Sequence, residues 1–146
     1  MNKRKTQHIE IGIVVSRFNR NVTQRLLDGC LKTLKSRGVS QKRIRVRWVP
    51  GAFEIPCAVS RMIHADRPRA VISLGAILKG ETPQNVYIAQ ACAYGLTRIA
   101  VETRIPCIFG IIVPDTMKQA LARTRGSLHR GVEAAQVALE VLHGSA

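Results

Sequence analysis

Short apolar runs rich in Val and Ile alternate along this chain with segments whose apolar residues recur at helical spacing, and this alternation constrains the fold most strongly. The apolar runs predict strands at residues 9–15, 44–49, 70–78 and 107–113. The periodic segments predict helices near residues 22–34, 53–63, 86–100, 115–124 and 132–142. Apolar strands joined by helices are typical of a parallel sheet covered on both faces. A chain of 146 residues is long enough for one such domain, which we expect to span residues 1–146.

Capping residues predict where several of these helices begin. Asn21, with a glutamine three residues later, resembles a capping box for the first helix. Thr82 and Pro83 suit the N-cap and the first helical position of the third helix. Asp115 is expected to cap the short fourth helix.

Distinctive residues follow the ends of the predicted strands, where ligands bind in open parallel sheets. Phe18 and Phe53 are two of only three Phe residues, and each follows such an end. In residues 49–56 a turn, a flat aromatic and a carboxylate suit a pocket for a planar ring with polar edges. Glu54 could accept hydrogen bonds from such a ring or from sugar hydroxyls. It is equally natural as an acid in a first helical turn.

A second group of residues suits a bound anion. Backbone N–H groups of Gly80, Glu81 and Thr82 would lie at a helix N-terminus, which attracts negative charge. The alternative is a plain strand-to-helix turn. Arg123 and Arg130 flank a glycine-containing loop, and either could grip a phosphate through its planar guanidinium. As isolated residues, arginines like these are more often solvated surface charges.

Several classes of protein are disfavoured. The cysteines form no C-x-x-C pair, and the histidines show no metal-ligand spacing, so we expect no metal site. Each cysteine lies in an apolar stretch, which predicts buried free thiols in a reducing cytoplasm; they are Cys30, Cys57, Cys92 and Cys107. No apolar run approaches the roughly 20 residues that span a bilayer. The basic N-terminus lacks the apolar core of a signal peptide.

The net charge of +14 is concentrated in the first half of the chain. Residues 1–69 carry 16 Lys and Arg against 4 Asp and Glu, whereas residues 70–146 carry 7 against 5. A basic face can attract nucleic acid or anionic substrates. Because no aromatic-interleaved basic stripe or helix-turn-helix pattern is present, we expect no specific nucleic-acid recognition.

Taken in order, these segments resemble the 6,7-dimethyl-8-ribityllumazine synthase family of riboflavin biosynthesis. The matching pieces are Ser-Arg-Phe-Asn at 16–19, residues 49–56, Leu-Gly-Ala at 74–76 with Gly-Glu-Thr-Pro at 80–83, Ile-Phe-Gly at 108–110, Gln119-Ala120 with Arg123, and Gly-Val-Glu-Ala-Ala at 131–135. They cover nearly the whole chain at the family's spacing. The resemblance implies an α/β fold, a flavodoxin-like three-layer αβα sandwich with a four-stranded parallel sheet. It also implies a transferase, with no cofactor and no metal, that condenses 5-amino-6-(D-ribitylamino)uracil with 3,4-dihydroxy-2-butanone 4-phosphate.

The resemblance assigns a role to each motif. The residues expected to bind the ribitylaminouracil are Phe18, Ala52, Phe53, Glu54, Ala76, Ile77, Leu78 and Phe109. The residues expected to bind the phosphate are Glu81, Thr82, Arg123 and Arg130. Phe18 would stack on the uracil ring, and Phe109 would close the pocket from an adjacent subunit.

The resemblance also implies an assembly. We expect a cytoplasmic homo-pentamer with sites between neighbouring subunits, either alone, as a dimer of pentamers, or as a 60-subunit icosahedral capsid, and an association with riboflavin synthase. In the family the N-terminal segment adds a strand to a neighbour's sheet. Here residues 1–8 are expected to be flexible or to dock on a neighbouring subunit.

The main departure from the family is Gln84, which occupies the position of the proton-transferring histidine. An amide cannot exchange protons near neutral pH as imidazole does, so slower turnover is expected. His129 is a weaker candidate for a substitute base. The loop before Gly131 is also one residue shorter than in the family, and Arg130 takes the place of its lysine.

Two alternatives to an active synthase remain from the sequence. One is a catalytically impaired paralogue that binds lumazine or flavin. The other is a basic, shell-forming protein that holds anionic cargo.

Overall fold

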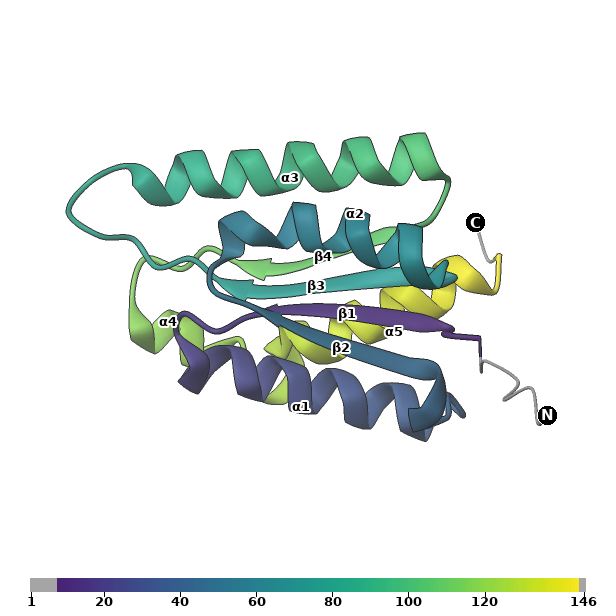
Figure 1. The fold of residues 1–146 in the computed structure, drawn as a ribbon. Helices are drawn as coiled ribbons and strands as arrows, with labels where there is room; N and C mark the ends of the chain where they lie inside the picture. The colour runs from purple at the N-terminus through teal and green to yellow at the C-terminus, as the bar shows by residue number, and fades with distance from the viewer. Residues whose placement is uncertain (1–7, 145–146) are drawn as a thin grey trace.

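The structure is a computed structural model, and it describes residues 8–144 of the chain. Four parallel strands form one sheet in the order β2-β1-β3-β4: β1 (Ile11–Ser16), β2 (Ile44–Val49), β3 (Ala70–Ala76) and β4 (Cys107–Ile112). The helices are α1 (Arg20–Ser36), α2 (Ile55–Asp66), α3 (Gln84–Thr103), α4 (Met117–Ala122) and α5 (Arg130–Leu142). Helices α2 and α3 cover one face of the sheet, and α1, α4 and α5 cover the other (Figure 1). The predicted three-layer α/β fold with four parallel strands is therefore confirmed.

The two central strands explain why the sequence contains continuous apolar runs. All residues of β1 and β3 are buried, because helices cover both of their faces. The edge strand β2 instead alternates half-buried Ile44, Val46 and Trp48 with exposed Arg45 and Arg47. Among the described strands, β2 pairs only with β1.

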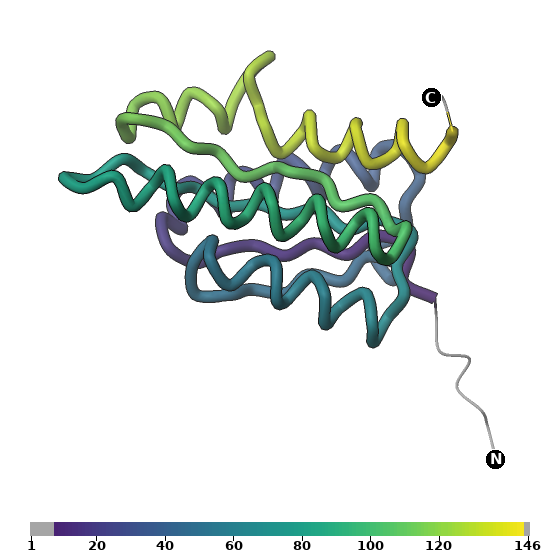
Figure 2. The backbone as a smooth tube through the Cα atoms, turned by 90° about the horizontal axis from the view of Figure 1, so that it is seen from above, coloured from purple at the N-terminus to yellow at the C-terminus, as the bar shows by residue number. Residues whose placement is uncertain are grey.

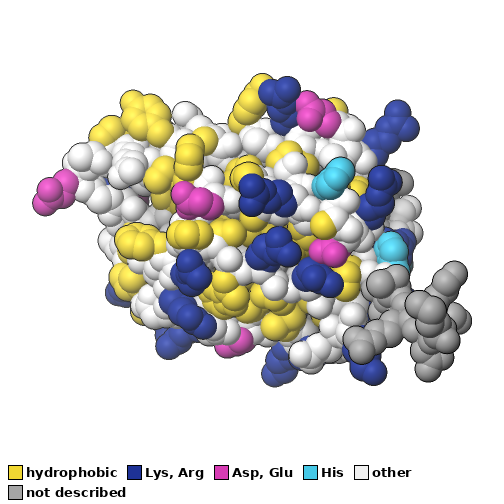
Figure 3. Space-filling view, in the orientation of Figure 1, with side chains coloured by type: hydrophobic (Ala, Val, Ile, Leu, Met, Phe, Trp, Pro, Cys, Tyr) yellow, Lys and Arg dark blue, Asp and Glu magenta, His cyan; other side chains and the backbone are white. Residues whose placement is uncertain are grey.

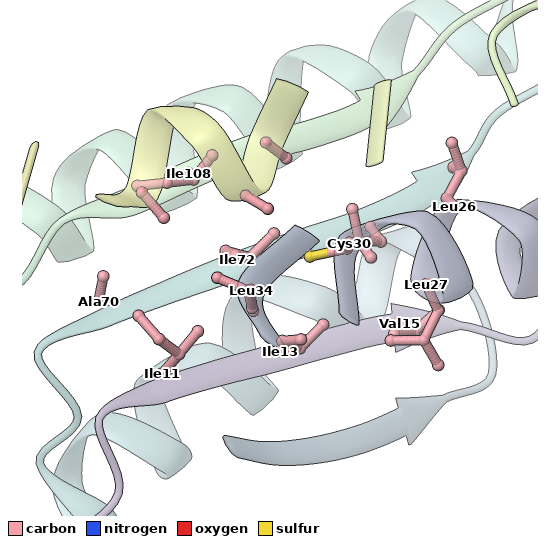
Figure 4. Packing of buried hydrophobic residues seen from close by; sticks show 14 of the residues in the cluster. Ile11, Ile13, Val15, Leu26, Leu27, Cys30, Leu34, Ala70, Ile72 and Ile108 are labelled. Carbon is pink, nitrogen blue, oxygen red and sulfur yellow. The ribbon is translucent and has the colours of Figure 1, made fainter. Parts of the chain in front are cut away.

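Two hydrophobic clusters lie on the two sides of the sheet. Alternate residues of β1 and β3 pack against α1 and α5, as Figure 4 shows for Ile13, Ile72 and Leu34. On the opposite face Val14 and Val71 pack against residues of α2 and α3 such as Met62. Seen from above, α3 runs beside β4 along the sheet (Figure 2). Helix α3 buries little of its surface within the chain, because Cys92 and Leu96 are its only buried residues.

Glycines allow α1 and α5 to approach each other closely. A Cβ atom on Gly131 would collide with the backbone carbonyl of Leu26, and one on Gly29 would collide with the His129 ring. The two helices cross at these points, so no larger residue fits there without a shift of the helices.

The predicted N-caps differ from those in the structure. Helix α1 begins at Arg20, after Asn19, so Asn21 lies inside the helix and the predicted capping box is absent. The Gln24 side chain donates to Asp28. Pro83, and not Thr82, precedes α3. In α4 the Thr116 hydroxyl accepts the Gln119 N–H at 3.2 Å, so the prediction of an Asp115 cap is wrong. Strand β3 ends at Ala76, two residues before the predicted end.

Candidate functional site

A cavity of about 300 Å³ lies beyond the carboxyl ends of β1, β2 and β3. We call it the ring cavity. It brings together nine of the residues predicted from the sequence, which are Phe18, Ala52, Phe53, Glu54, Ala76, Ile77, Leu78, Thr82 and Gln84. Its other lining residues are Gly51, Gly80, Asn85 and Ile88. Asn85 and Ile88 were missed by the sequence analysis, although Ile88 is four residues from Gln84 and therefore lies on the same side of α3.

The turn after β1 presents Phe18 to this cavity. The Phe18 N–H donates to the Pro50 carbonyl at 3.0 Å, which ties the turn to the end of β2. Asn19 adopts a left-handed conformation with φ of 59°, and its side-chain amide donates to the Ala76 carbonyl at 3.1 Å. The Phe18 side chain is 73% exposed, so its ring is free to stack on a planar ligand.

A short 3-10 turn, Ala52–Glu54, forms the shelf of the cavity. The Glu54 N–H donates to the Gly51 carbonyl, and the Gly51 N–H donates to Glu54 Oε2 at 2.9 Å. Glu54 therefore stabilises the start of this turn, in addition to any contact with a ligand. A carboxylate has about four lone-pair sites, so it retains capacity to accept bonds from a ligand. Phe53 is 64% exposed and offers a second aromatic face.

The segment between β3 and α3 borders a second hollow. The Ile77 N–H donates to Ile112, and the Lys79 N–H donates to Pro114 at 3.1 Å, which fixes this segment beside the end of β4. Glu81 and Thr82 line the hollow, and Thr82 also faces the ring cavity. Lys79 and Asp115 line it as well. Lys79 was missed by the sequence analysis, although its place directly before Gly80 was a usable signal.

Arg123 and Arg130 lie apart from the ring cavity in the single chain. They line a separate cavity of about 520 Å³ with residues from the end of β4. The Arg130 N–H donates to the Arg123 carbonyl at 2.8 Å, so the two backbones are in contact. The Arg130 guanidinium also lies 3.1 Å from Glu133.

Phe109 lines a further cavity, of about 350 Å³, which Arg130 also borders. We call it the Phe109 cavity. Phe109 is 40% exposed, although it belongs to a strand. Phe109, Arg123 and Arg130 thus form a second group, carried by β4 and the segments that follow it. The structure brings these three residues near one another, and in one chain it does not bring them to the shelf.

His129 acts as the N-cap of α5. Its Nδ1 accepts the Val132 N–H at 3.3 Å. Partial burial lowers the pKa of His129, because it disfavours the imidazolium form. The ring packs against Gly29 of α1, so within the chain this imidazole does not line the ring cavity.

The cysteines have different environments. Cys30 and Cys92 are buried, Cys107 is half-buried, and Cys57 is exposed, so the expectation of burial is wrong for Cys57. Burial raises the pKa of the Cys30 thiol to about 12 and that of Cys107 to about 11. These two thiols therefore stay protonated near neutral pH. Among residues 8–144 no three potential ligands cluster to hold a metal ion.

Positive charge is spread over the surface. Lys and Arg side chains are scattered over the face shown in Figure 3, among hydrophobic side chains and a few acidic ones. Some of this charge is paired, since Glu10 lies within 3.5 Å of both Arg43 and Arg69, and Asp66 lies 3.3 Å from Arg45. Exposed pairs of this kind contribute little to stability. Within residues 8–144 no helix is long and apolar enough to cross a membrane.

Two comparisons with known proteins identify relatives of this chain. The family model of 6,7-dimethyl-8-ribityllumazine synthase matches residues 8–145. A curated protein of Protochlamydia amoebophila (strain UWE25), described as 6,7-dimethyl-8-ribityllumazine synthase, is 42% identical over 133 residues. The alignment covers 90% of this chain and 77% of that protein.

Proposed function

Because the chain belongs to the 6,7-dimethyl-8-ribityllumazine synthase family, we propose that its ring cavity and its arginine group are the two halves of a synthase site. The function is that of the family. The protein is a transferase of riboflavin biosynthesis that condenses 5-amino-6-(D-ribitylamino)uracil with 3,4-dihydroxy-2-butanone 4-phosphate. The products are 6,7-dimethyl-8-ribityllumazine, phosphate and water. The proposed site rests on one observation: a single cavity at the strand ends is lined by Phe18, Phe53 and Glu54.

The ring cavity holds the pyrimidine in this proposal. Phe18 stacks on the uracil ring, and Ala76, Ile77 and Leu78 line the pocket beneath it. The second lone pairs of Glu54 accept from the ring edge or from ribityl hydroxyls. Exposed aromatic faces beside a fixed carboxylate suit a ligand that is flat, apolar on its faces and polar at its edges.

The phosphate of the second substrate binds at the neighbouring hollow. Glu81 and Thr82 offer backbone N–H groups there, and Thr82 also offers its hydroxyl. Arg123 and Arg130 supply guanidinium groups, which bind phosphate oxygens through paired N–H donors. Lys79, which lines the same hollow, adds a cation.

Two neighbouring subunits complete the site. In one chain the guanidinium groups line a cavity different from the ring cavity, which supports a site that a second subunit completes. A cyclic assembly, such as the homo-pentamer expected for this family, would place Phe109, Arg123 and Arg130 of one subunit against the shelf of the next. An interface at the Phe109 cavity is supported by exposed apolar side chains around it, which are Phe109, Val137 and Val141.

The chemistry needs little beyond positioning. The pyrimidine amine forms an imine with the ketone and expels water, phosphate is then eliminated, the ribityl nitrogen attacks the remaining carbonyl to close the second ring, and a second water is lost. Both reactants are intrinsically reactive, so holding them together supplies much of the acceleration. Gln84, the first residue of α3, faces the ring cavity at the position of the family's histidine. We propose that Gln84 orients a reacting group by hydrogen bonding and that turnover is slower without an imidazole.

The direct test is turnover. Purified protein mixed with both substrates should form the lumazine chromophore well above the spontaneous rate in buffer. A rate equal to that in buffer would exclude the synthase assignment. Tight lumazine or flavin binding without turnover would favour a binding paralogue, which the family match does not favour. A light-scattering mass decides between pentamer, decamer and 60-mer, and co-elution with riboflavin synthase tests that association.

The thiol environment supports a cytoplasmic location within this proposal. Cys30, Cys92 and Cys107 are buried or half-buried single thiols, which are characteristic of proteins kept under reducing conditions. Cell fractionation would test the location.

A further inference from the structure

Cys92 forms a hydrogen bond with the shelf, to a residue 40 positions away in the sequence. Its side chain is completely buried on α3, and its thiol donates to the Ala52 carbonyl at a distance of 3.2 Å from Sγ to oxygen. The same carbonyl also accepts the Ile55 N–H. The Ala52–Phe53 peptide is thus held by one bond from its own turn and by one from α3.

Cys92 continues the side of α3 that faces the ring cavity. Gln84, Ile88 and Cys92 are spaced four residues apart, which places them along one side of the helix. Gln84 and Ile88 line the cavity, and Cys92 follows on the next turn with its bond to the shelf. The helix is further held where Gly95 meets Pro56 of α2, since a Cβ on Gly95 would lie 3.2 Å from Pro56 Cβ.

We propose that Cys92 is a positioning residue of the synthase site, which fixes the pyrimidine shelf relative to the helix that carries Gln84. The proposal rests on the function proposed above. Cys92 touches neither substrate, and it acts through Ala52 and Phe53. The orientation of these two residues determines where the flat ring lies against Phe18.

The thiol acts as a donor and not as a nucleophile. Burial raises the pKa of Cys92 to about 11, with a smaller contribution from the negative charge of Glu54. The S–H group is therefore intact throughout the working pH range. Removal of the thiol would leave the Ala52 carbonyl with only its local partner and would let α3 and the shelf move relative to each other.

Four proteins make up the test: the unaltered chain, Cys92→Ala, Cys92→Ser and Cys30→Ala. Cys30 is the matched control, because it is also completely buried but belongs to α1, on the opposite face of the sheet from Cys92. We expect Cys92→Ala to raise the KM for the ribitylaminouracil and the Kd for 6,7-dimethyl-8-ribityllumazine by about threefold to tenfold, the effect of one lost hydrogen bond. The KM for the butanone phosphate should stay within twofold of the unaltered value, and Cys92→Ser, which keeps a donor, should recover most of the pyrimidine KM.

The outcomes are separable. If Cys92→Ala and Cys30→Ala lower the Tm to a similar degree and neither changes the pyrimidine KM, Cys92 is only a packing residue and the proposal is wrong. If Cys92→Ala fails to fold, Cys92→Val takes its place, because it keeps a buried apolar side chain but has no donor, and a rise in its pyrimidine KM without a rise in its butanone phosphate KM supports the proposal. A Cys92→Ser pyrimidine KM raised as much as the butanone phosphate KM overturns it. An unaltered chain that neither turns over nor binds the lumazine refutes the proposed function itself, and this inference with it.

Discussion

The side-chain amide of Asn19 donates a 3.1 Å hydrogen bond to the backbone carbonyl of Ala76, which joins the turn after β1 to the end of β3. The two residues are 57 positions apart in the sequence. Phe18 precedes one partner and Ile77 follows the other, so this bond sets the distance between the stacking ring and the floor of the ring cavity.

Loss of the Asn19 amide should therefore weaken pyrimidine binding. Asn19 has φ of 59°, a conformation in which alanine is strained, so Asn19→Gly is the substitution that removes the amide and retains the backbone. We expect the KM for the ribitylaminouracil to rise about fivefold, consistent with one lost hydrogen bond. Asn21→Ala is the control, because that amide lies outside the cavity and contacts only Met117 Sδ, at 3.6 Å. Equal KM values for the two variants would contradict the assignment.

Restoration of the family's histidine should accelerate the reaction. General acid–base catalysis typically contributes ~10²–10⁴-fold, and Gln84 already faces the ring cavity. We expect Gln84→His to raise kcat by roughly tenfold or more and to introduce a pH dependence with a midpoint near the pKa of histidine. Steady-state rates from pH 5 to 9 measure both effects. The control is Gln90→His on the exposed side of α3, which should change neither. If Gln84→His behaves like this control, position 84 has another role.

Arg123 should act on the phosphate-bearing substrate alone. Its guanidinium lines the cavity after β4, and a lost charge-assisted bond to phosphate typically reduces affinity by about tenfold or more. We expect Arg123→Ala to raise the KM for the butanone phosphate by that factor and to leave the pyrimidine KM unchanged. Arg125→Ala, two residues along, removes an exposed arginine that does not line the cavity and serves as the control. A parallel loss in both variants would indicate only a general effect of surface charge.

The cap made by His129 predicts a pH-dependent stability. Burial lowers the pKa of His129 in the folded chain below its ordinary value near 6.5. The unfolded chain then binds more protons between these two pKa values, so the free energy of unfolding rises with pH across that interval. This stabilisation is complete above pH 6.5 and is lost as the pH falls below it. Denaturant titrations at pH 5 and 7.5 should show this difference. They should show less of it for His129→Asn, which caps without titrating.

Sequence periodicity predicted the layers and the sheet because both follow from which residues must avoid water. The helix starts were less predictable. A cap depends on backbone angles that composition does not specify, and Asn19 rather than Asn21 precedes α1 in a left-handed conformation. Thr116 likewise caps α4 where Asp115 was expected. The exposure of Cys57 was missed for a related reason, since its apolar neighbours gave no sign of which side of α2 it faces.

The sequence predicted most of the residues that line the ring cavity, and the resemblance assigned Phe109 to an adjacent subunit, but neither predicted that Arg123 and Arg130 line a cavity of their own. Motifs at strand ends identified Phe18, Phe53 and Glu54, because all parallel strands end at the same edge of the sheet. The distance of Arg123 from that group could not be read from the sequence. The role of Cys92 was equally hidden, because its bond to Ala52 spans 40 residues and joins two elements that no local pattern connects.

The separation of shelf and guanidinium groups within one chain has a genetic consequence. Two impaired variants, Phe53→Ala with a damaged shelf and Arg123→Ala with a damaged arginine group, carry their defects in different cavities. In the cyclic assembly proposed above, co-expressed copies would form mixed rings in which some interfaces unite an intact shelf with an intact arginine. Such rings would turn over faster at low substrate concentration than the rings of either parent. Interallelic complementation of this kind would appear as faster growth without added riboflavin in a strain that carries both alleles.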